Sequence, residues 1–464
     1  MRASLHRLLW LVVLSGGGFS LSACSQQSPE QAARSKPPTP DRSVVKPVVP
    51  PAVSIGEALP VLDVTSARQS TAAAAAANVF ALITDEDDDT TEPEELLVDP
   101  DPGTPEWLIR EITRIQSAPL DAVRTAVPGK PGEFEVVQLT QEQTEVEEMR
   151  RAEKVITLAL EVCTKTKDDK DRQLLFNNAV HYLANSRVTL AAYGDHDHVR
   201  LLGEEAEMLF KRDPKSFGAV ELQLRLVDCL AELAEQEGRK NDAWGQKAAR
   251  QARLFASRFP HETNRCALTL VSAARACEVG GRFDDARQCF ELLDRDFSKT
   301  PFAEQAAGAI RRYKLAGQPL GEFAGATIDG GFVSIDEFRG KPVLIVFWSA
   351  ESPSFREDLP RLKQLIGSQS DRSLAVVGVN MDIDERTVDT FIEQAEINWR
   401  TIFFSSLEQR GIRNPLARAY GVTTVPQYWL IDAQGKVVAA PVDLKTLAGR
   451  FSQVAVEGDA PARR

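Results

Sequence analysis

The chain has 464 residues, of which 43% are hydrophobic and 26% are charged, proportions that are typical of folded globular domains. This length is sufficient for two or three domains. The 67 acidic residues outnumber the 55 Lys and Arg residues, so the formal net charge is −12. A surplus of acid argues against nucleic acid as a partner, because phosphates are bound by basic surfaces.

The first 23 residues have the layout of a secretory signal. Arg2 and Arg7 precede an apolar run at residues 8–14, and small residues follow up to Ala23. The run is shorter than the roughly 20 residues that span a bilayer. Residues 1–23 are therefore predicted to be a cleaved signal peptide, and the alternative is an uncleaved anchor helix.

The sequence "LSAC" at residues 21–24 resembles the lipobox of bacterial lipoproteins. This resemblance implies that Cys24 becomes the lipid-modified N-terminus and that the membrane is one partner. Several acyl chains, at ~0.8 kcal/mol per buried CH₂, hold a protein durably on a membrane. Ser25 follows the cysteine where Asp would favour inner-membrane retention, so the outer membrane is favoured. We expect a cell-envelope protein that is lipid-anchored and faces the periplasm or the outside.

Residues 24–103 have the composition of a linker. A proline-rich stretch covers residues 35–54, six alanines occupy residues 72–77, and an acidic stretch covers residues 85–95. Such a composition favours extended chain and buries too little apolar surface to offset the entropy of ordering. We therefore predict a disordered tether between the lipidated cysteine and the folded part.

Residues 104–314 have a helical pattern. Thr104 is a suitable N-cap, Pro105 occupies the first helical position, and the segment 119–135 is expected to be irregular. Three similar units follow, with closing prolines that are 46 and 41 residues apart. Each unit has a turn glycine, an aromatic residue near the end of a helix, and a closing proline: Gly194, Phe210 and Pro214; Gly238, Phe255 and Pro260; Gly281, Phe290 and Pro301. This spacing predicts stacked helical hairpins.

The last unit, "GRFDDARQCFELL", resembles a tetratricopeptide repeat at Gly281, Phe283, Ala286 and Phe290. The resemblance implies a concave surface that binds a protein or peptide partner. The alternative is that these helices form only a spacer or support.

The remaining cysteines are predicted to be small buried hydrophobes, because most of them lie in helical, apolar patterns. A disulfide between Cys266 and Cys277, or between Cys277 and Cys289, stays open at this point, and so does the state of the others, Cys163 and Cys229. The motif "GDHDHVR" at residues 194–200 contains two histidines but lacks an evident third ligand. No metal and no other cofactor is expected.

Residues 315–457 change to alternating strands and helices, and residues 458–464 form a short tail. The pattern begins with a hairpin that turns at Asp329–Gly331, continues with an apolar strand at residues 343–348, and ends with two strands joined at residues 433–435. Such alternation predicts a parallel sheet that ends in an antiparallel hairpin. The predicted fold class is therefore multidomain, an α-helical repeat region followed by an α/β domain.

This last segment resembles a thioredoxin-fold domain of the TlpA or AhpC/TSA type. The motifs that carry the resemblance are "GKPVLIVFW" (residues 340–348), "GVN" (378–380), "YGVTTVPQYWLID" (420–432) and "GKVV" (435–438). In that family the loop after the first core strand reads W-C-x-P-C. Aligned without gaps, Ser352 and Phe355 occupy the two cysteine positions, with Pro353 and Ser354 between them. Pro426, preceded by Val425, matches the cis-proline that faces the site.

The two catalytic cysteines of that family are thus absent from this segment. Disulfide exchange needs a thiolate, and no cysteine follows Cys289. The sequence predicts no catalytic residue and a thioredoxin-like domain that serves protein binding or scaffolding rather than redox chemistry. The groove between the serine loop and Pro426 can hold an extended peptide, or it is retained with the fold and binds nothing. The alternative function is a thiol–disulfide oxidoreductase or antioxidant protein of the TlpA type.

Overall fold

The computed structural model describes residues 99–126, 132–368 and 374–458, which belong to one compact unit of the chain. The predicted signal peptide, Cys24, almost all of the predicted linker and the tail lie outside these residues. None of the helices in the described ranges is long and apolar enough to cross a membrane.

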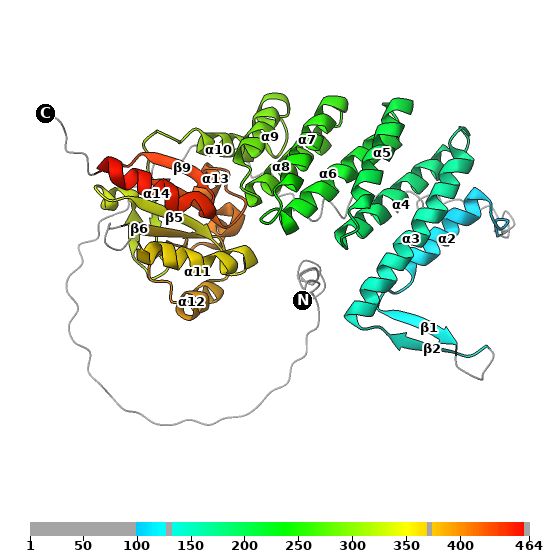
Figure 1. The fold of residues 1–464 in the computed structure, drawn as a ribbon, viewed down its shortest axis with the longest axis horizontal. Helices are drawn as coiled ribbons and strands as arrows, with labels where there is room; N and C mark the ends of the chain where they lie inside the picture. Colours follow the sequence, from blue (N-terminus) through cyan, green and yellow to red (C-terminus); the bar gives the residue numbers. More distant parts are fainter. Residues whose placement is uncertain (1–98, 127–131, 369–373, 459–464) are drawn as a thin grey trace, which may run out of the picture. The chain divides into compact units, whose positions relative to one another are not determined.

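The first part of this unit is helical (Figure 1). It contains α2 (Pro105–Ser117), α3 (Gln141–Thr166), α4 (Gln173–Ala192), α5 (Asp197–Arg212), α6 (Phe217–Glu237), α7 (Ala243–Arg258), α8 (Thr263–Val279), α9 (Phe283–Asp296) and α10 (Ala303–Tyr313). The predicted start is confirmed, since Pro105 begins α2 and the Thr104 hydroxyl accepts a hydrogen bond from the Trp107 amide. The three sequence units correspond to α5, α7 and α9, each of which ends before its predicted closing proline.

Small residues determine how closely these helices pack. Helices α4, α6 and α8 are neighbours, and α6 and α8 are rich in buried alanine, including Ala219, Ala234, Ala267 and Ala274. One continuous apolar core runs from Phe176 in α4 to Ala309 in α10. Because each helix buries its apolar face against its neighbours, the core belongs to the array and not to any single hairpin.

The segment expected to be irregular instead forms a β-hairpin between α2 and α3. Strands β1 (Ala122–Ala126) and β2 (Phe134–Gln138) pair antiparallel. Residues 127–131, between the two strands, lie outside the described residues. The prediction of irregular chain over residues 119–135 was wrong for these strands, because Pro and Gly interrupt regular structure only locally and do not prevent strands on either side.

The second part carries a five-stranded sheet of order β7-β6-β5-β8-β9. Strands β5 (Val343–Trp348), β6 (Ala375–Asn380) and β7 (Arg400–Ile402) are parallel, while β8 (Gln427–Ile431) and β9 (Val437–Val442) are antiparallel. A small hairpin of β3 (Ala324–Ala326) and β4 (Phe332–Ser334) precedes them. The helices are α11 (Pro353–Ser368), α12 (Glu385–Gln394), α13 (Pro415–Ala419) and α14 (Leu444–Gly458). The predicted parallel sheet with a terminal antiparallel hairpin is confirmed.

Strand β5 is buried on both faces, as a central parallel strand should be. Val343, Ile345 and Phe347 join one core with α13 and the β3–β4 hairpin. Leu344, Val346 and Trp348 join a second core with α11, α12 and α14. The alternation of side chains along the strand thus divides a continuous apolar run between two layers.

Candidate functional site

The loop after β5 ends at Ser352, and this serine begins α11. Its hydroxyl accepts a hydrogen bond of 3.2 Å from the Phe355 amide, and its carbonyl accepts one of 3.2 Å from the Arg356 amide. Pro353 follows as the first helical residue, where its missing N–H costs nothing. Ser352 is therefore an N-cap, a role that its side chain suits well.

Phe355, at the second cysteine position, is a core residue. Its ring is fully buried and stacks on Trp348 with centroids 5.1 Å apart, and Phe391 lies 6.1 Å away. The two positions that carry sulfur in the resembling family are thus used here for capping a helix and for filling a core.

Ser352 and Val425 lie together, as the predicted site requires. The Ser352 hydroxyl donates a hydrogen bond of 3.3 Å to the Val425 carbonyl, and the peptide bond between Val425 and Pro426 is cis. Ser352, Val425 and Pro426 are all half-buried. The Val425 carbonyl, beside which an extended peptide was expected, thus accepts a hydrogen bond from within the chain.

A buried carboxylate, that of Asp382, holds the loop between β5 and α11 by hydrogen bonds. Asp382 follows β6 and accepts hydrogen bonds from the Ser349 hydroxyl at 2.5 Å, the Ala350 amide at 2.7 Å and the Asn380 side chain at 2.6 Å. Three donors satisfy this carboxylate, which accounts for its position in the interior. Asp382 therefore holds the loop in shape and is not free to act as a base on a ligand.

The thiols in the part of the chain that the structure describes lie elsewhere, in the helical part. Cys163, Cys229, Cys266, Cys277 and Cys289 are all free, so the two disulfides left open by the sequence do not form. Burial raises the pKa of Cys163, Cys229 and Cys266 to about 12 and that of Cys289 to about 11, and it raises the pKa of Cys277 as well. Reactive cysteines have the opposite setting, exposed and with a lowered pKa.

The helical part reaches the serine loop through Arg239, just after α6. Its guanidinium donates a hydrogen bond of 2.9 Å to the Ser354 carbonyl and forms an ion pair with Asp358. Asp358 also accepts a hydrogen bond of 2.8 Å from the Tyr428 hydroxyl. Burial and this carboxylate raise the pKa of Tyr428 above its ordinary value. One side of the serine–proline groove is thereby tied to α6.

The other side is tied to α8 through Glu278. Its carboxylate is almost wholly buried and accepts hydrogen bonds of 3.0 Å from both the Thr424 hydroxyl and the Gln427 amide, which flank Pro426. Glu278 also pairs with Arg312 of α10, which is fully buried and donates to the Tyr420 carbonyl at 3.1 Å and the Gly421 carbonyl at 2.9 Å. A carboxylate and a guanidinium of the helical part thus bond residues on both sides of Pro426 in the sequence.

Sequence reasoning missed Arg239, Glu278 and Arg312. A signal was present for two of them, since Glu278 follows the small-residue run "SAARAC" and Arg312 ends the apolar face of α10. A charge inside an apolar pattern indicates a buried partner. The sequence does not say which residue that partner is.

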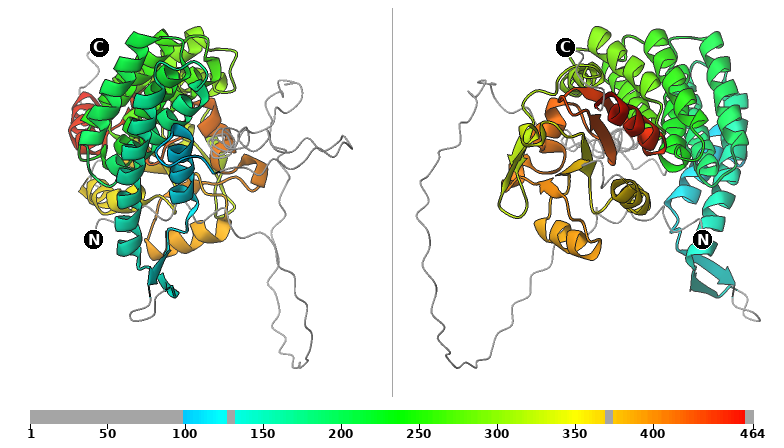
Figure 2. Two further views of the ribbon diagram at one scale, coloured as in Figure 1. Left: turned by 90° about the vertical axis from the view of Figure 1, so that its right-hand side faces the viewer. Right: turned by 60° about the vertical axis from the view of Figure 1, so that its left-hand side comes forward.

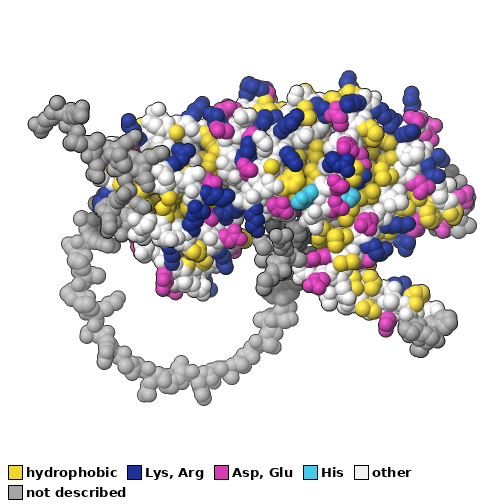
Figure 3. All heavy atoms as spheres, viewed as in Figure 1, with side chains coloured by type: hydrophobic (Ala, Val, Ile, Leu, Met, Phe, Trp, Pro, Cys, Tyr) yellow, Lys and Arg dark blue, Asp and Glu magenta, His cyan; other side chains and the backbone are white. Residues whose placement is uncertain are grey.

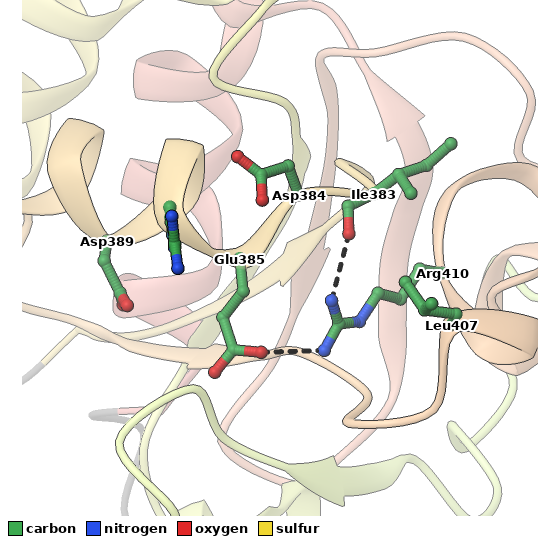
Figure 4. A pocket seen from close by; sticks show the side chains of 7 residues that line it. Ile383, Asp384, Glu385, Asp389, Leu407 and Arg410 are labelled. Carbon is green, nitrogen blue, oxygen red and sulfur yellow. Dashed lines mark hydrogen bonds and ion pairs between the residues drawn. The ribbon is translucent and has the colours of Figure 1, made fainter. Parts of the chain in front are cut away.

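A shallow hollow of about 480 Å³ lies beside the same end of the sheet, next to the loop after β6 (Figure 4). Arg410 lines this hollow and donates hydrogen bonds to the Ile383 carbonyl at 3.0 Å and to the Glu385 carboxylate at 2.8 Å. Further bonds run from Arg410 to the Phe404 and Ser405 carbonyls. The Arg410 guanidinium is thus fully engaged within the chain, while Arg386 also lines the hollow.

The comparison with protein families identifies the second part. Residues 316–440 match the AhpC/TSA family. This part of the chain is an AhpC/TSA domain with the thioredoxin fold. The AhpC/TSA domain follows the helical region, so the resemblance predicted from the four motifs is confirmed.

Relatives of the AhpC/TSA domain are named as thiol–disulfide oxidoreductases. The chain is 24% identical over 130 residues to "Thiol-disulfide oxidoreductase ResA" of Halalkalibacterium halodurans, a match that covers 28% of this chain and 70% of the relative. It is 26% identical over 124 residues to "Thioredoxin-like protein YneN" of Bacillus subtilis, a match that covers 26% of this chain and 68% of the relative. The chain thus spans about two thirds of these relatives.

Solved structures also resemble this domain. A thioredoxin domain of a thiol–disulfide oxidoreductase from Bacteroides vulgatus is 24% identical, with a TM-score of 0.27, and covers 30% of this chain and 96% of its own. A structure titled as a putative thiol:disulfide interchange protein DsbE from Chlorobium tepidum is 23% identical, with a TM-score of 0.27. The match covers 30% of this chain and 97% of that structure's chain.

Proposed function

We propose that this protein is a lipid-anchored scaffold of the bacterial envelope whose AhpC/TSA domain binds protein and carries out no redox chemistry. The observation that carries the proposal is the use of the two family cysteine positions: Ser352 caps α11 and Phe355 fills the core. A serine hydroxyl cannot form a mixed disulfide. Four of the five thiols in the helical part are buried and Cys163 is half-buried, and burial raises the pKa of each, so none of these described thiols is suited to replace the missing cysteines.

The scaffold part of the proposal is supported by the junction between the two parts. Glu278, Arg312 and Arg239 tie α6, α8 and α10 to the AhpC/TSA domain from both sides of the serine–proline groove. A buried, hydrogen-bonded ion pair resists separation, because each charge left alone in the interior is costly. The helical array and the domain would then present their surfaces to partners in a constant arrangement.

The names of the relatives favour a second function, thiol–disulfide exchange, and one assay separates the two. Reduction of insulin by dithiothreitol is measured with the full chain, with Ser352→Ala, and with a CxxC-containing thioredoxin as positive control. We expect the full chain and Ser352→Ala to match the uncatalysed rate. A rate above background that Ser352→Ala abolishes would establish chemistry at this loop and overturn the proposal.

A gain-of-function variant tests the mapping of the loop. Ser352→Cys combined with Phe355→Cys places two thiols at a helix N-terminus, where the pKa of the first is lowered. We expect these thiols to form a reversible disulfide in a glutathione redox titration. A folded double variant whose thiols never pair would show that the residue positions are assigned incorrectly.

The anchor is tested separately at Cys24. Cells that express the full chain are grown with radioactive palmitate, and membrane and soluble fractions are compared with those of Cys24→Ser. We expect label and membrane attachment in the natural chain and neither in the variant. Equal attachment of both chains would refute lipidation at Cys24.

A further inference from the structure

The β1–β2 hairpin is an exposed arm. Its two strands pair only with each other, and every residue of β2 is exposed, including Phe134 at 58%, Val136 at 64% and Val137 at 39%. In Figures 1 and 2 the hairpin extends beyond the ends of α2 and α3, and Figure 3 shows apolar side chains over it. An isolated two-stranded hairpin is marginally stable in water, and three or more strands with an apolar face are needed for independent stability.

The base of the arm is held firmly. Arg151 of α3 donates to the Ala118 carbonyl at 2.7 Å and to the Pro119 carbonyl at 2.8 Å, where α2 leads into β1. Glu147 accepts from the same guanidinium at 2.7 Å. The mostly buried ion pair between Arg151 and Glu147 therefore fixes the segment that leads into the hairpin. We infer that the fold holds the hairpin in its exposed position.

The free hydrogen-bonding groups of β2 follow from the ladder. The Leu139 amide donates to the Asp121 carbonyl at 2.8 Å, so this pair is hydrogen-bonded. Bonded and non-bonded pairs alternate in an antiparallel ladder. In the observed register, the non-bonded residues of β2 are Phe134, Val136 and Gln138, whose N–H and C=O groups point away from β1.

We propose that β2 pairs antiparallel with β2 of a second copy of this chain, with Val136 opposite Val136 on a two-fold axis. This register places Phe134 opposite Gln138. The hydrogen bonds between the two copies are then made by the N–H and C=O groups of Phe134, Val136 and Gln138, which point away from β1. Glu135 then faces Val137, and no charge faces a like charge. The result is a four-stranded sheet, which meets the requirement that the single hairpin lacks.

Charge selects β2 over β1 for this contact. The outward-pointing residues of β1 are Ala122, Arg124 and Ala126, by the same alternation. Pairing β1 with itself about its centre would set Arg124 directly opposite Arg124, and like charges in that position are destabilising. Arg124 instead lies over the Phe134 ring of its own hairpin, 5.5 Å from the ring centre.

Cysteine cross-linking in membranes of cells that express the full chain tests the register. Val136→Cys places two thiols opposite each other with Cα atoms about 5.5 Å apart, within disulfide reach. Arg124→Cys is the matched control, because it lies across the ladder from Val136 but on the outer strand, about 14 Å from its copy. We expect a disulfide-linked dimer from Val136→Cys and none from Arg124→Cys or the natural chain, in which four of the five described thiols are buried and Cys163 is half-buried.

Proline substitution tests the same edge without sulfur. Val136→Pro removes an N–H that points away from β1, so the hairpin stays paired while the outer edge is blocked. Arg124→Pro does the same to the β1 edge. In sedimentation of the detergent-solubilised full chain, we expect loss of the dimer with Val136→Pro only.

Three results would overturn the proposal. The first is absence of cross-linking by Val136→Cys together with a monomeric natural chain. The second is equal cross-linking by Arg124→Cys, which would indicate a different edge. The third is protection of Val136→Cys from a water-soluble maleimide without any dimer, which would indicate that the arm contacts the membrane.

Discussion

Glu278 in the last turn of α8 accepts a hydrogen bond of 3.0 Å from Gln427, the residue that follows the cis-proline. The residues are 149 positions apart in the chain, and both side chains are buried. Through this contact, the helical part is joined to the strand that follows the cis-proline.

Glu278→Gln should destabilise the full chain strongly. The substitution keeps the shape but leaves the fully buried Arg312 guanidinium without its counter-charge, and breaking a buried pair on one side costs about 3–5 kcal/mol. The free energy of unfolding is measured by urea denaturation followed by tryptophan fluorescence. Glu304→Gln is the matched control, because Glu304 pairs with Arg418 across the same junction but both are exposed; its change should stay within about 0.5 kcal/mol. Equal effects would show that the buried pair does not hold the junction.

Gly308→Ala should weaken the junction although alanine is the better helix former. A Cβ at Gly308 would lie 2.6 Å from the Gly421 amide nitrogen and 2.9 Å from the Arg418 carbonyl oxygen, both backbone atoms that cannot move aside easily. Overpacking of this kind costs about 1–3 kcal/mol. Gly203→Ala in α5 is the control, because its Cβ meets only Leu226 at 3.7 Å, and it should gain about 0.5–1 kcal/mol. Thermal unfolding of both variants checks the contrast, and a stabilised Gly308→Ala would contradict the close approach.

Phe355→Cys should cost more stability than Ser352→Cys. The first removes a fully buried ring that stacks on Trp348, a loss of about 2–4 kcal/mol by comparison with other large-to-small core changes. The second removes only a helix cap, a loss of about 1 kcal/mol. Urea denaturation of the two single variants under reducing conditions gives both values. A larger loss at Ser352 would mean that Phe355 is not the core residue described here.

Glu221 should make the stability of the chain depend on pH below neutrality. Burial by itself raises the pKa of Glu221, but the hydrogen bond with His181 and the charge of Arg225 outweigh it and lower the pKa to about 2. Because the folded pKa lies below the ordinary value of 4.5, this stabilisation is present above pH 4.5 and is lost as the pH falls toward 2.

The corresponding variant is Glu221→Gln, which lacks this titration. Each pH unit in the window removes up to about 1.4 kcal/mol from the natural chain, so the unfolding free energy of Glu221→Gln should fall less steeply between pH 4.5 and 2. Glu235→Gln, an exposed residue on the same helix, should leave the steepness unchanged. Parallel curves for Glu221→Gln and the natural chain would exclude Glu221 as the source.

Much of the fold could be predicted from local pattern. The N-cap at Thr104, the three repeated helical units and the two-faced burial of residues 343–348 all follow from periodicity and turn chemistry, which act over a few residues. The family resemblance led us to expect the serine loop opposite Pro426, but not the hydrogen bond between Ser352 and Val425. The β1–β2 hairpin was missed because its turn residues also fit an irregular loop.

The absence of sulfur from the AhpC/TSA domain can be read directly from the order of residues, since no cysteine follows Cys289. What stands at those positions became clear from the folded chain: a cap at Ser352, a core ring at Phe355, and a junction held by Arg239, Glu278 and Arg312. The physical reason is distance along the chain. A cap or a buried strand depends on near neighbours, whereas the partner of a buried charge depends on which remote element the fold brings against it.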